Sequence, residues 1–312
     1  MTTTVPKIFA FHEFSGVAEA VADHVVHAQD SALAPNNERK HSVTNISLNA
    51  LDMTREASCK STASVVETKS AGSSSGSNNC KLKKEKRFRI ALSGGSLIQV
   101  LHEGLLKRDD VRWGEWDIYF ADERLVPFSS NESNYGCAKR KILDLINTAK
   151  YGTPTVYHID ESLIEDAQEC ADNYEKVLIR GFAGRDSVKL PMFDLFLLGC
   201  APDGHIASLF PNFQDNLREK LAWVVPVENA PSGPSTRISL TIPVICHSHR
   251  VTFVVEGATK APIIKTIMER PEKGLPSSIV NEGAAGRVSW FVDDDALTDV
   301  LVTKKKYKFH PA

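Results

Sequence analysis

The 312-residue chain is long enough for one large α/β domain or two small ones. Its 42% hydrophobic and 24% charged residues are typical of a globular protein, and a formal net charge of -2 gives no general attraction to nucleic acids or anionic membranes. Six cysteines are scattered without a C-x-x-C pair, which argues against a disulfide framework or a zinc site. The N-terminus does not resemble a secretory signal, and no apolar run approaches the roughly 18 residues of a membrane span. We expect a cytoplasmic protein that also has access to the nucleus.

The first predicted elements are a strand at 7–14 and an amphipathic helix at 15–29. From 31 to 86 the composition changes to Ser, Asn, Thr and Lys, and this part includes the run AGSSSGSNN. Such a segment buries too little apolar surface to offset the entropy of ordering it. We therefore predict a single domain made of residues 1–30 and 87–312, with a disordered, low-complexity insertion at 31–86.

Beyond the insertion, strands and helices alternate along the chain. Strands are predicted at 87–95, 116–123, 193–200, 237–245, 250–257 and 288–295, and helices at 96–107, 134–146, 161–182 and 259–269. This alternation indicates an α/β fold with a mostly parallel, Rossmann-like sheet and helices on both faces. Ligands of such folds bind beyond the carboxyl ends of the strands, where the Gly-rich turns of this chain occur.

The first of these turns consists of Ser93, Gly94, Gly95 and Ser96, between a predicted strand and a predicted helix. Glycines let the backbone approach an anion closely, and a helix N-terminus presents N–H groups and a favourable dipole. The alternative is a strand-to-helix turn without a ligand. The spacing matches neither a P-loop nor G-x-G-x-x-G, so it does not indicate a nucleotide site.

Three charged residues, Asp122, Glu123 and Arg124, come at the end of the next predicted strand. The planar guanidinium of Arg124 is suited to binding a phosphate or a carboxylate. The alternative is an exposed loop that holds a local ion pair.

The segment LLGCAPDGHIASLFP, at 197–211, contains the strongest candidate for catalysis. His205 lies on a Gly-rich loop after an apolar strand, and Asp203 is near enough in sequence to orient or polarise it. A neutral imidazole near pH 7 is suited to activating water. A lone histidine is more often structural, but Asp-Gly-His on such a loop favours a catalytic origin.

Two further cations lie at strand ends. Lys260 follows the turn Gly257-Ala258-Thr259, where it could complete a phosphate site or point into solvent. Arg237, at the start of RISLTIP, has the same two interpretations.

Two basic clusters, KLKKEKRFR at 81–89 and KKKYK at 304–308, have the composition of RNA-phosphate contacts or of an import signal. The alternative is that they form a solvated linker and tail.

Taken together and in this order, seven motifs resemble the 6-phosphogluconolactonases, within the sugar-phosphate isomerase and deaminase superfamily. They are ALSGGS, ADERLVP with the following SNYG, LLGCAPDGHIASLFP, RISLTIPVI, VEGATK, LPSSIV and VSWFVDDDA. The likeness covers nearly all of 1–30 and 87–300. The related glucosamine-6-phosphate deaminases have Asp-Glu-Tyr where this chain has Arg124 in third place, and Asn-Glu-Pro where it has SLFP at 208–211. Both differences favour the lactonases.

The resemblance implies that the substrate is a phosphorylated sugar lactone. His205, with Asp203, would take a proton from the water that attacks the lactone carbonyl, and ring opening would give 6-phosphogluconate. Arg124 and Lys260 would hold the phosphate or the developing carboxylate, helped by the N–H groups of the 93–96 turn. No metal or organic cofactor is implied. A monomer is expected, because the chain has no heptad run and no long exposed apolar helix.

One residue departs from the family pattern, which has glycine at the position of Ala201. If φ is positive there, alanine costs about 1–2 kcal/mol or shifts the loop. A displacement of His205 by about 1 Å would lower the rate roughly a hundredfold. If φ is negative, the substitution is harmless.

Ala201 and the insertion together resemble a fungal lactonase-like branch whose members include proteins linked to tRNA export and distribution. Two hypotheses follow. In the first, the protein is a cytosolic 6-phosphogluconolactonase of the oxidative pentose phosphate pathway, which the intact site residues favour. In the second, it is a weakly active or inactive paralogue that acts in tRNA nuclear export, with weak or indirect contacts through 81–89 and 304–308. Ala201 and the basic insertion favour the second hypothesis.

Overall fold

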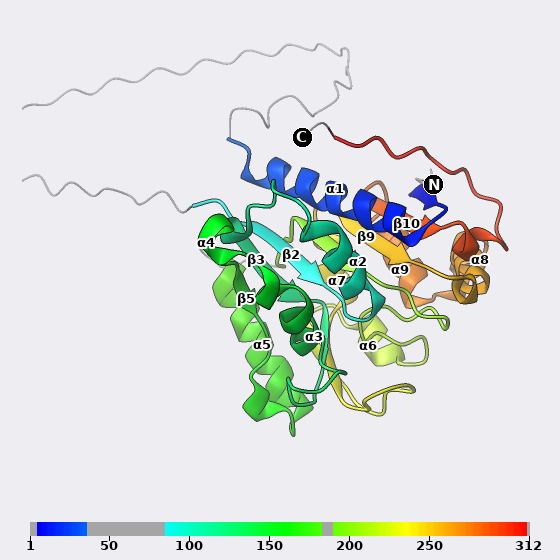
Figure 1. Ribbon diagram of the computed structural model, residues 1–312. Helices are drawn as coiled ribbons and strands as arrows, with labels where there is room; N and C mark the ends of the chain where they lie inside the picture. The colour runs from blue at the N-terminus through cyan, green and yellow to red at the C-terminus, as the bar shows by residue number, and fades with distance from the viewer. Residues whose placement is uncertain (1–4, 36–84, 183–189, 311–312) are drawn as a thin grey trace, which may run out of the picture. The chain divides into compact units, whose positions relative to one another are not determined.

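The computed structural model describes residues 5–35, 85–182 and 190–310 of the chain (Figure 1). Residues up to Leu33 and from Lys86 onward belong to one compact unit. The predicted insertion at 31–86 lies outside the described residues except at its two ends. At the first of these ends, helix α1 (Phe14–Leu33) continues past the predicted boundary at residue 30.

The unit contains strands and helices in alternation. The strands are β1 (Lys7–Phe11), β2 (Phe88–Leu92), β3 (Trp116–Phe120), β4 (Asp122–Arg124), β5 (Thr155–Tyr157), β6 (Leu195–Leu198), β7 (Val224–Val227), β8 (Arg237–Leu240), β9 (Val251–Val255) and β10 (Val288–Asp293). After α1, the helices are α2 (Ser96–Leu105), α3 (Asn134–Lys141), α4 (Thr148–Tyr151), α5 (Ala167–Phe182), α6 (Gln214–Arg218), α7 (Ile242–His247), α8 (Ala261–Glu269) and α9 (Pro276–Gly283).

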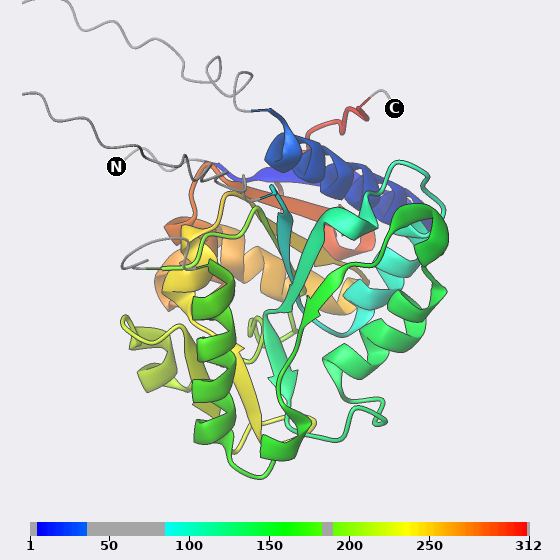
Figure 2. The ribbon, with the colours of Figure 1, turned by 90° about the vertical axis from the view of Figure 1, so that its left-hand side faces the viewer.

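Seven strands form the main sheet in the order β1-β10-β9-β6-β2-β3-β5, and neighbouring strands in it are parallel. Helices α1, α2 and α3 pack on one face, and α5, α7, α8 and α9 pack on the other (Figures 1 and 2). The predicted fold class is thereby confirmed. From the adjacent strands β2 and β6 the chain order runs outward in opposite directions, so a topological switch point lies between them.

The interior strands are apolar because helices cover both of their faces. Every residue of β3, β6 and β9 is buried. Strand β1 lies at the edge of the sheet and is shorter than the predicted strand at 7–14. The C-terminal segment covers this edge: the N–H of Lys305 donates to the carbonyl of Ile8, and the Tyr307 ring lies 5.1 Å from that of Phe9. The C-terminal segment is therefore part of the folded unit.

A second, antiparallel sheet has the order β4-β8-β7. It corrects two predictions. The predicted strand at 116–123 is split into β3 and β4, which belong to different sheets. The predicted strand at 237–245 ends at Leu240, and α7 follows with Pro243 in its first turn. Proline has no N–H to donate to a strand and its fixed φ suits the start of a helix, which explains the change.

Candidate active site

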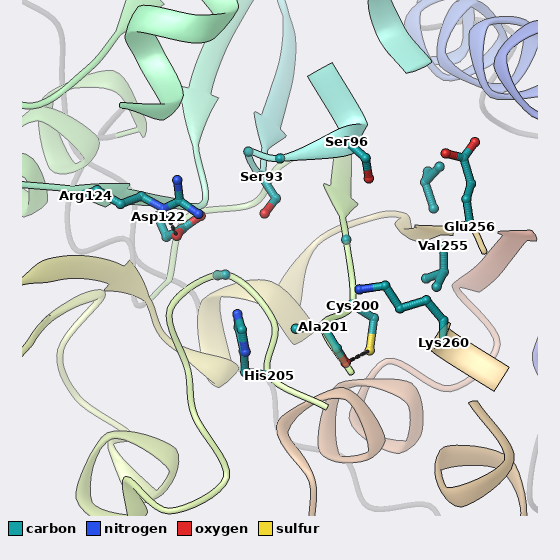
Figure 3. Close-up of a pocket in the computed structure, with 15 residues that line it drawn as sticks. Ser93, Ser96, Asp122, Arg124, Cys200, Ala201, His205, Val255, Glu256 and Lys260 are labelled. Atoms are coloured by element: carbon teal, nitrogen blue, oxygen red, sulfur yellow. Dashed lines mark hydrogen bonds and ion pairs between the residues drawn. The ribbon is translucent and has the colours of Figure 1, made fainter. Parts of the chain in front are cut away.

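A cavity of about 170 Å³ lies at the carboxyl ends of β2, β6 and β9, at the switch point of the main sheet (Figure 3). Most residues predicted for the site line this cavity: Ser93, Gly94, Gly95, Ser96, Arg124, His205 and Lys260. Its wall also includes residues that were not predicted to bind the ligand or to act in catalysis, among them Asp122, Cys200, Ala201, Ala207 and Glu256. Residues more than 160 positions apart thus meet because parallel strands end at one edge of the sheet.

The turn after β2 contributes backbone and two hydroxyl groups to the cavity. Gly95 is the N-cap of α2 with φ 71°, and no side chain caps the helix. The neighbouring Gly94 has no room for a side chain, because a Cβ there would lie 1.8 Å from Oδ1 of Asn134. Both glycines are therefore required by the local structure, and the uncapped N-terminus of α2 adjoins the cavity as an anion site requires.

His205 and Asp203 form a hydrogen-bonded pair. Nδ1 of His205 lies 2.7 Å from Oδ1 of Asp203, and the same oxygen accepts the backbone N–H of His205 at 3.1 Å. An ionised Asp203 only accepts, so Nδ1 carries the hydrogen and Nε2 is left as an acceptor. Burial lowers the pKa of His205, and the charge of Asp203 opposes this effect. The imidazole is thus neutral near pH 7, and its Nε2 makes no hydrogen bond to another of the described residues.

The loop from 201 to 205 is held by its backbone. The N–H of Ala201 donates to the carbonyl of His205 at 3.1 Å, and the N–H of Gly204 donates to that of Ala201 at 2.9 Å. Within the described ranges, the non-glycine residues with positive φ are Ala207 and Asn229. Ala201 is not one of them, so the backbone strain considered for this position is absent. Its methyl group lies on the cavity wall (Figure 3), and its effect is therefore steric.

Arg124 reaches the cavity from β4. Its Nη1 donates to the carbonyl of Glu132 at 2.8 Å, and its Nε lies 3.9 Å from Oδ2 of Asp122. Asp122 is buried and fixed in turn, because its Oδ2 accepts the hydroxyl of Ser208 at 2.7 Å. These contacts hold the guanidinium at one end of the cavity, opposite Lys260 (Figure 3).

Arg237, predicted to bind the ligand, does not line the cavity. Its side chain is 2% exposed and lies 5.3 Å from the ring of Phe210. Its Nε donates to the carbonyl of Pro234 at 2.9 Å, another guanidinium nitrogen donates to the carbonyl of Ser232, and Nη1 lies 3.5 Å from the hydroxyl of Ser208. Arg237 thus supports the wall through Ser208 and the 232–234 loop.

Lys260 and Glu256 occupy the other end of the cavity. Lys260 ends a short 3-10 turn that begins after Gly257, whose N–H donates to Oδ2 of Asp293 at 2.8 Å. Its ammonium group points into the cavity (Figure 3) and makes no ion pair with another described residue. Glu256, which comes directly after β9, was not predicted as a site residue, and Asp122 was noted only as one of the three charges at the end of its predicted strand. The strand-end argument that drew attention to the glycines and to Asp122 applies equally to Glu256.

Some of the lysines and arginines in the two basic clusters already have partners within the fold, and others are exposed. Of the cluster at 81–89, residues 81–84 lie outside the described residues. Arg87 pairs with Asp117 at 2.5 Å, and Arg89 donates to the carbonyl of Gly181. In the cluster at 304–308, Lys304 pairs with Asp294 at 2.7 Å, while lysines 305, 306 and 308 are exposed.

A family model described as glucosamine-6-phosphate isomerases/6-phosphogluconolactonase matches residues 62–290. The chain is 93% identical over 310 residues to 6-phosphogluconolactonase-like protein 2 of Saccharomyces cerevisiae, with 99% of this chain and 98% of the relative covered. It is 78% identical over 315 residues to 6-phosphogluconolactonase-like protein 1 of the same yeast, with the same shares covered. The chain belongs to this family. The resemblance inferred from the motifs is thereby confirmed.

The fold is also that of solved members of the family. The 6-phosphogluconolactonase of Trypanosoma brucei has a TM-score of 0.69 and 20% sequence identity, with 96% of this chain and 100% of that chain covered. Among the described residues of the present chain, no helix is both long and apolar enough to cross a membrane.

Proposed function

We propose that the protein hydrolyses 6-phosphogluconolactone to 6-phosphogluconate in the oxidative pentose phosphate pathway, with His205 as the general base. The observation that carries this proposal is the hydrogen-bonded pair of Asp203 and His205 beside a cavity with a cation at each end. A phosphorylated lactone has matching chemistry, since it carries a dianionic group at one end and develops negative charge at the other. The names of the two yeast relatives, 6-phosphogluconolactonase-like proteins 2 and 1, support this substrate class.

Hydrolysis begins when Nε2 of His205 removes a proton from water as the water oxygen attacks the lactone carbonyl carbon. The carbonyl π electrons move to its oxygen, which becomes an oxyanion. As the oxyanion collapses, the bond between that carbon and the ring oxygen breaks. The imidazolium returns its proton to the departing ring oxygen, which becomes a hydroxyl, and the new acid ionises to a carboxylate. Water is thus added across one C–O bond, and the chain is regenerated.

The neighbours of His205 fit this role. Asp203 holds the hydrogen on Nδ1 and stabilises the imidazolium when it forms. Arg124 lies toward the same end of the cavity as His205 (Figure 3), where its charge would stabilise the oxyanion. A base in this position typically contributes about 10²–10⁴-fold to the rate, and positioned donors contribute more.

A lactonase assay on the purified protein, corrected for spontaneous hydrolysis, tests the proposal. We expect His205→Gln to lose at least about 10²-fold in kcat/KM, and Glu269→Gln, at an exposed position on α8, to change nothing. Because the pKa of His205 is lowered from 6.5, loss of kcat/KM through protonation of this base should begin only below pH 6.5. Wild-type protein without activity above the spontaneous rate would contradict the proposal.

A second candidate is a role in tRNA handling, in the cytoplasm and nucleus. The supporting observation is the ordered C-terminal segment, where lysines 305, 306 and 308 are exposed while Tyr307 is packed against the fold. Filter binding of tRNA against salt tests it. Replacing the three lysines with glutamine should reduce the salt slope by about 3, and deleting 31–86 separates the contribution of the insertion. The absence of any salt-dependent binding by the full chain would exclude direct contact.

A further inference from the structure

Glu256 is a charged residue of the cavity that the proposed reaction does not use. It follows β9 directly and lines the cavity, where its Oε1 is buried and has no hydrogen-bond partner among the described residues. A buried polar atom without a partner is costly, and the cost is greatest when the group is charged, so this enclosure favours a neutral carboxyl group in the cavity wall.

The position of Glu256 specifies which part of the ligand it meets. Glu256, Lys260 and Ser96 lie at the end of the cavity away from Arg124 and Asp122, and His205 lies nearer to Arg124 (Figure 3). If the lactone carbonyl is beside His205, the phosphate at the far end of the ligand lies among Lys260, Ser96 and the N-terminus of α2. Glu256 is therefore at the phosphate end.

The surroundings of Glu256 favour its acid form. Burial, and next the charge of Asp293, raise the pKa of Glu256 to about 7. The carboxyl group of Asp293 is held in place, because its two oxygens accept the backbone N–H groups of Gly257 and Ala296 at 2.8 and 2.9 Å. The other ionisable groups that share the cavity with Glu256 are Lys260, Arg124, Asp122, His205 and Cys200. Burial raises the pKa of the Cys200 thiol to about 12 and lowers that of His205, so both are neutral between pH 7 and 8.

We propose that Glu256 is a specificity-determining residue whose protonated carboxyl group donates a hydrogen bond to the phosphate of the ligand. The proposal rests on the proposed function, because it takes the ligand to be a sugar phosphate. A phosphate monoester is a dianion above about pH 6. An ionised Glu256 would repel this dianion, whereas the acid form offers an O–H donor to it. Binding therefore draws a proton onto Glu256, and the site selects a phosphorylated ligand more strongly as the pH falls toward 7.

The consequence is measurable with 6-phosphogluconate, the stable product, as the ligand. At pH 8 most of the free Glu256 is ionised, so binding should take up nearly one proton, compared with about half a proton at pH 7. The dissociation constant should then increase roughly fivefold between pH 7 and pH 8. Isothermal titration calorimetry in two buffers of different ionisation enthalpy gives both quantities on the unmodified full-length chain.

Two variants and a second ligand complete the test. Glu256→Gln keeps an N–H donor but has no proton to take up, so its affinity should be independent of pH between 7 and 8. Glu269→Gln, an exposed carboxylate on α8, should behave as wild type. Gluconate has the same carbon chain without the phosphate, and its binding should take up no proton at Glu256.

The outcomes separate this inference from the proposed function. Binding of 6-phosphogluconate by wild type without proton uptake would overturn the inference alone. Uptake that persists in Glu256→Gln would assign the proton to His205 and would also overturn it. If that variant fails to fold, equal uptake with gluconate and 6-phosphogluconate in wild type overturns it as well. If wild type binds no 6-phosphogluconate at any pH, the proposed function and this inference fail together.

Discussion

Two alanines of the His205 loop differ in backbone conformation, and replacing each with glycine should have different effects on stability. Ala207 has φ 48°, within the left-handed region, in a turn closed by a hydrogen bond of 2.9 Å from the N–H of Leu209 to the carbonyl of Ile206. Ala201 does not have a positive φ. We expect Ala207→Gly to be more stable than Ala201→Gly.

The difference in the free energy of unfolding between Ala207→Gly and Ala201→Gly comes from the contributions that the two substitutions do not share. The left-handed conformation costs alanine about 1–2 kcal/mol, which Ala207→Gly removes and Ala201→Gly does not. Both variants gain unfolded-state entropy worth about 0.4–1 kcal/mol, and both lose one methyl group. The methyl of Ala207 is the more buried of the two, which narrows the difference slightly. A gap of about 1 kcal/mol remains in the free energy of unfolding, or roughly 2–4 °C in Tm.

Urea unfolding of both variants beside wild type measures this gap, with equal m values as the condition for comparing midpoints. If Ala201→Gly proved the more stable variant, position 201 rather than position 207 would carry the backbone strain. His205 would then be displaced by the alanine, and the argument that the base is intact would fail with it.

Two further predictions concern buried cations and histidines. Arg237→Ala should lower the free energy of unfolding, measured in urea, by about 3 kcal/mol, because it removes a buried side chain with its packing on Phe210 and its hydrogen bonds to two backbone carbonyls. Lost ligand affinity at unchanged stability would instead place Arg237 in the binding site. Burial lowers the pKa of His24 to about 3, so below pH 6.5 the unfolded chain binds a proton that the folded chain does not. Stability should fall as the pH drops from 6.5 toward 3, by up to about 1.4 kcal/mol per pH unit, and His24→Gln should remove this part. If the free energy of unfolding of wild type and of His24→Gln depended on pH in the same way, the lowered pKa of His24 would not be its cause.

The site residues that could be predicted from the sequence are those that lie at or just after the ends of strands. Ser93, Arg124, His205 and Lys260 each lie on a turn after a strand, or within a few residues of one, and parallel strands of one sheet end at the same edge. Their proximity therefore follows from the alternation of strands and helices, without knowledge of side-chain positions. The same reasoning gave the fold class.

What sequence could not predict depends on packing between segments. Arg237 has the same local pattern as Arg124, and their backbones pair across β4 and β8. Antiparallel pairing in a small second sheet, rather than position at a strand end, places Arg237 behind Ser208 and leaves Arg124 at the cavity. The short strands and the conformation of Ala201 have no periodic signal, because each is set by neighbours far away in the chain.

The structure also changes what a substitution at position 201 means. The hydrogen bonds that shape the loop use the N–H and carbonyl groups of Ala201, not its side chain. A methyl group in place of a hydrogen therefore leaves the geometry of Asp203 and His205 intact and alters only the space beside them. Glu256, at the other end of the cavity, likewise follows its strand without contributing a hydrogen bond to the fold from Oε1. Both positions line the cavity without holding the loop or strand in place through their side chains, so substitutions at 201 or 256 are expected to change ligand affinity while the fold is kept.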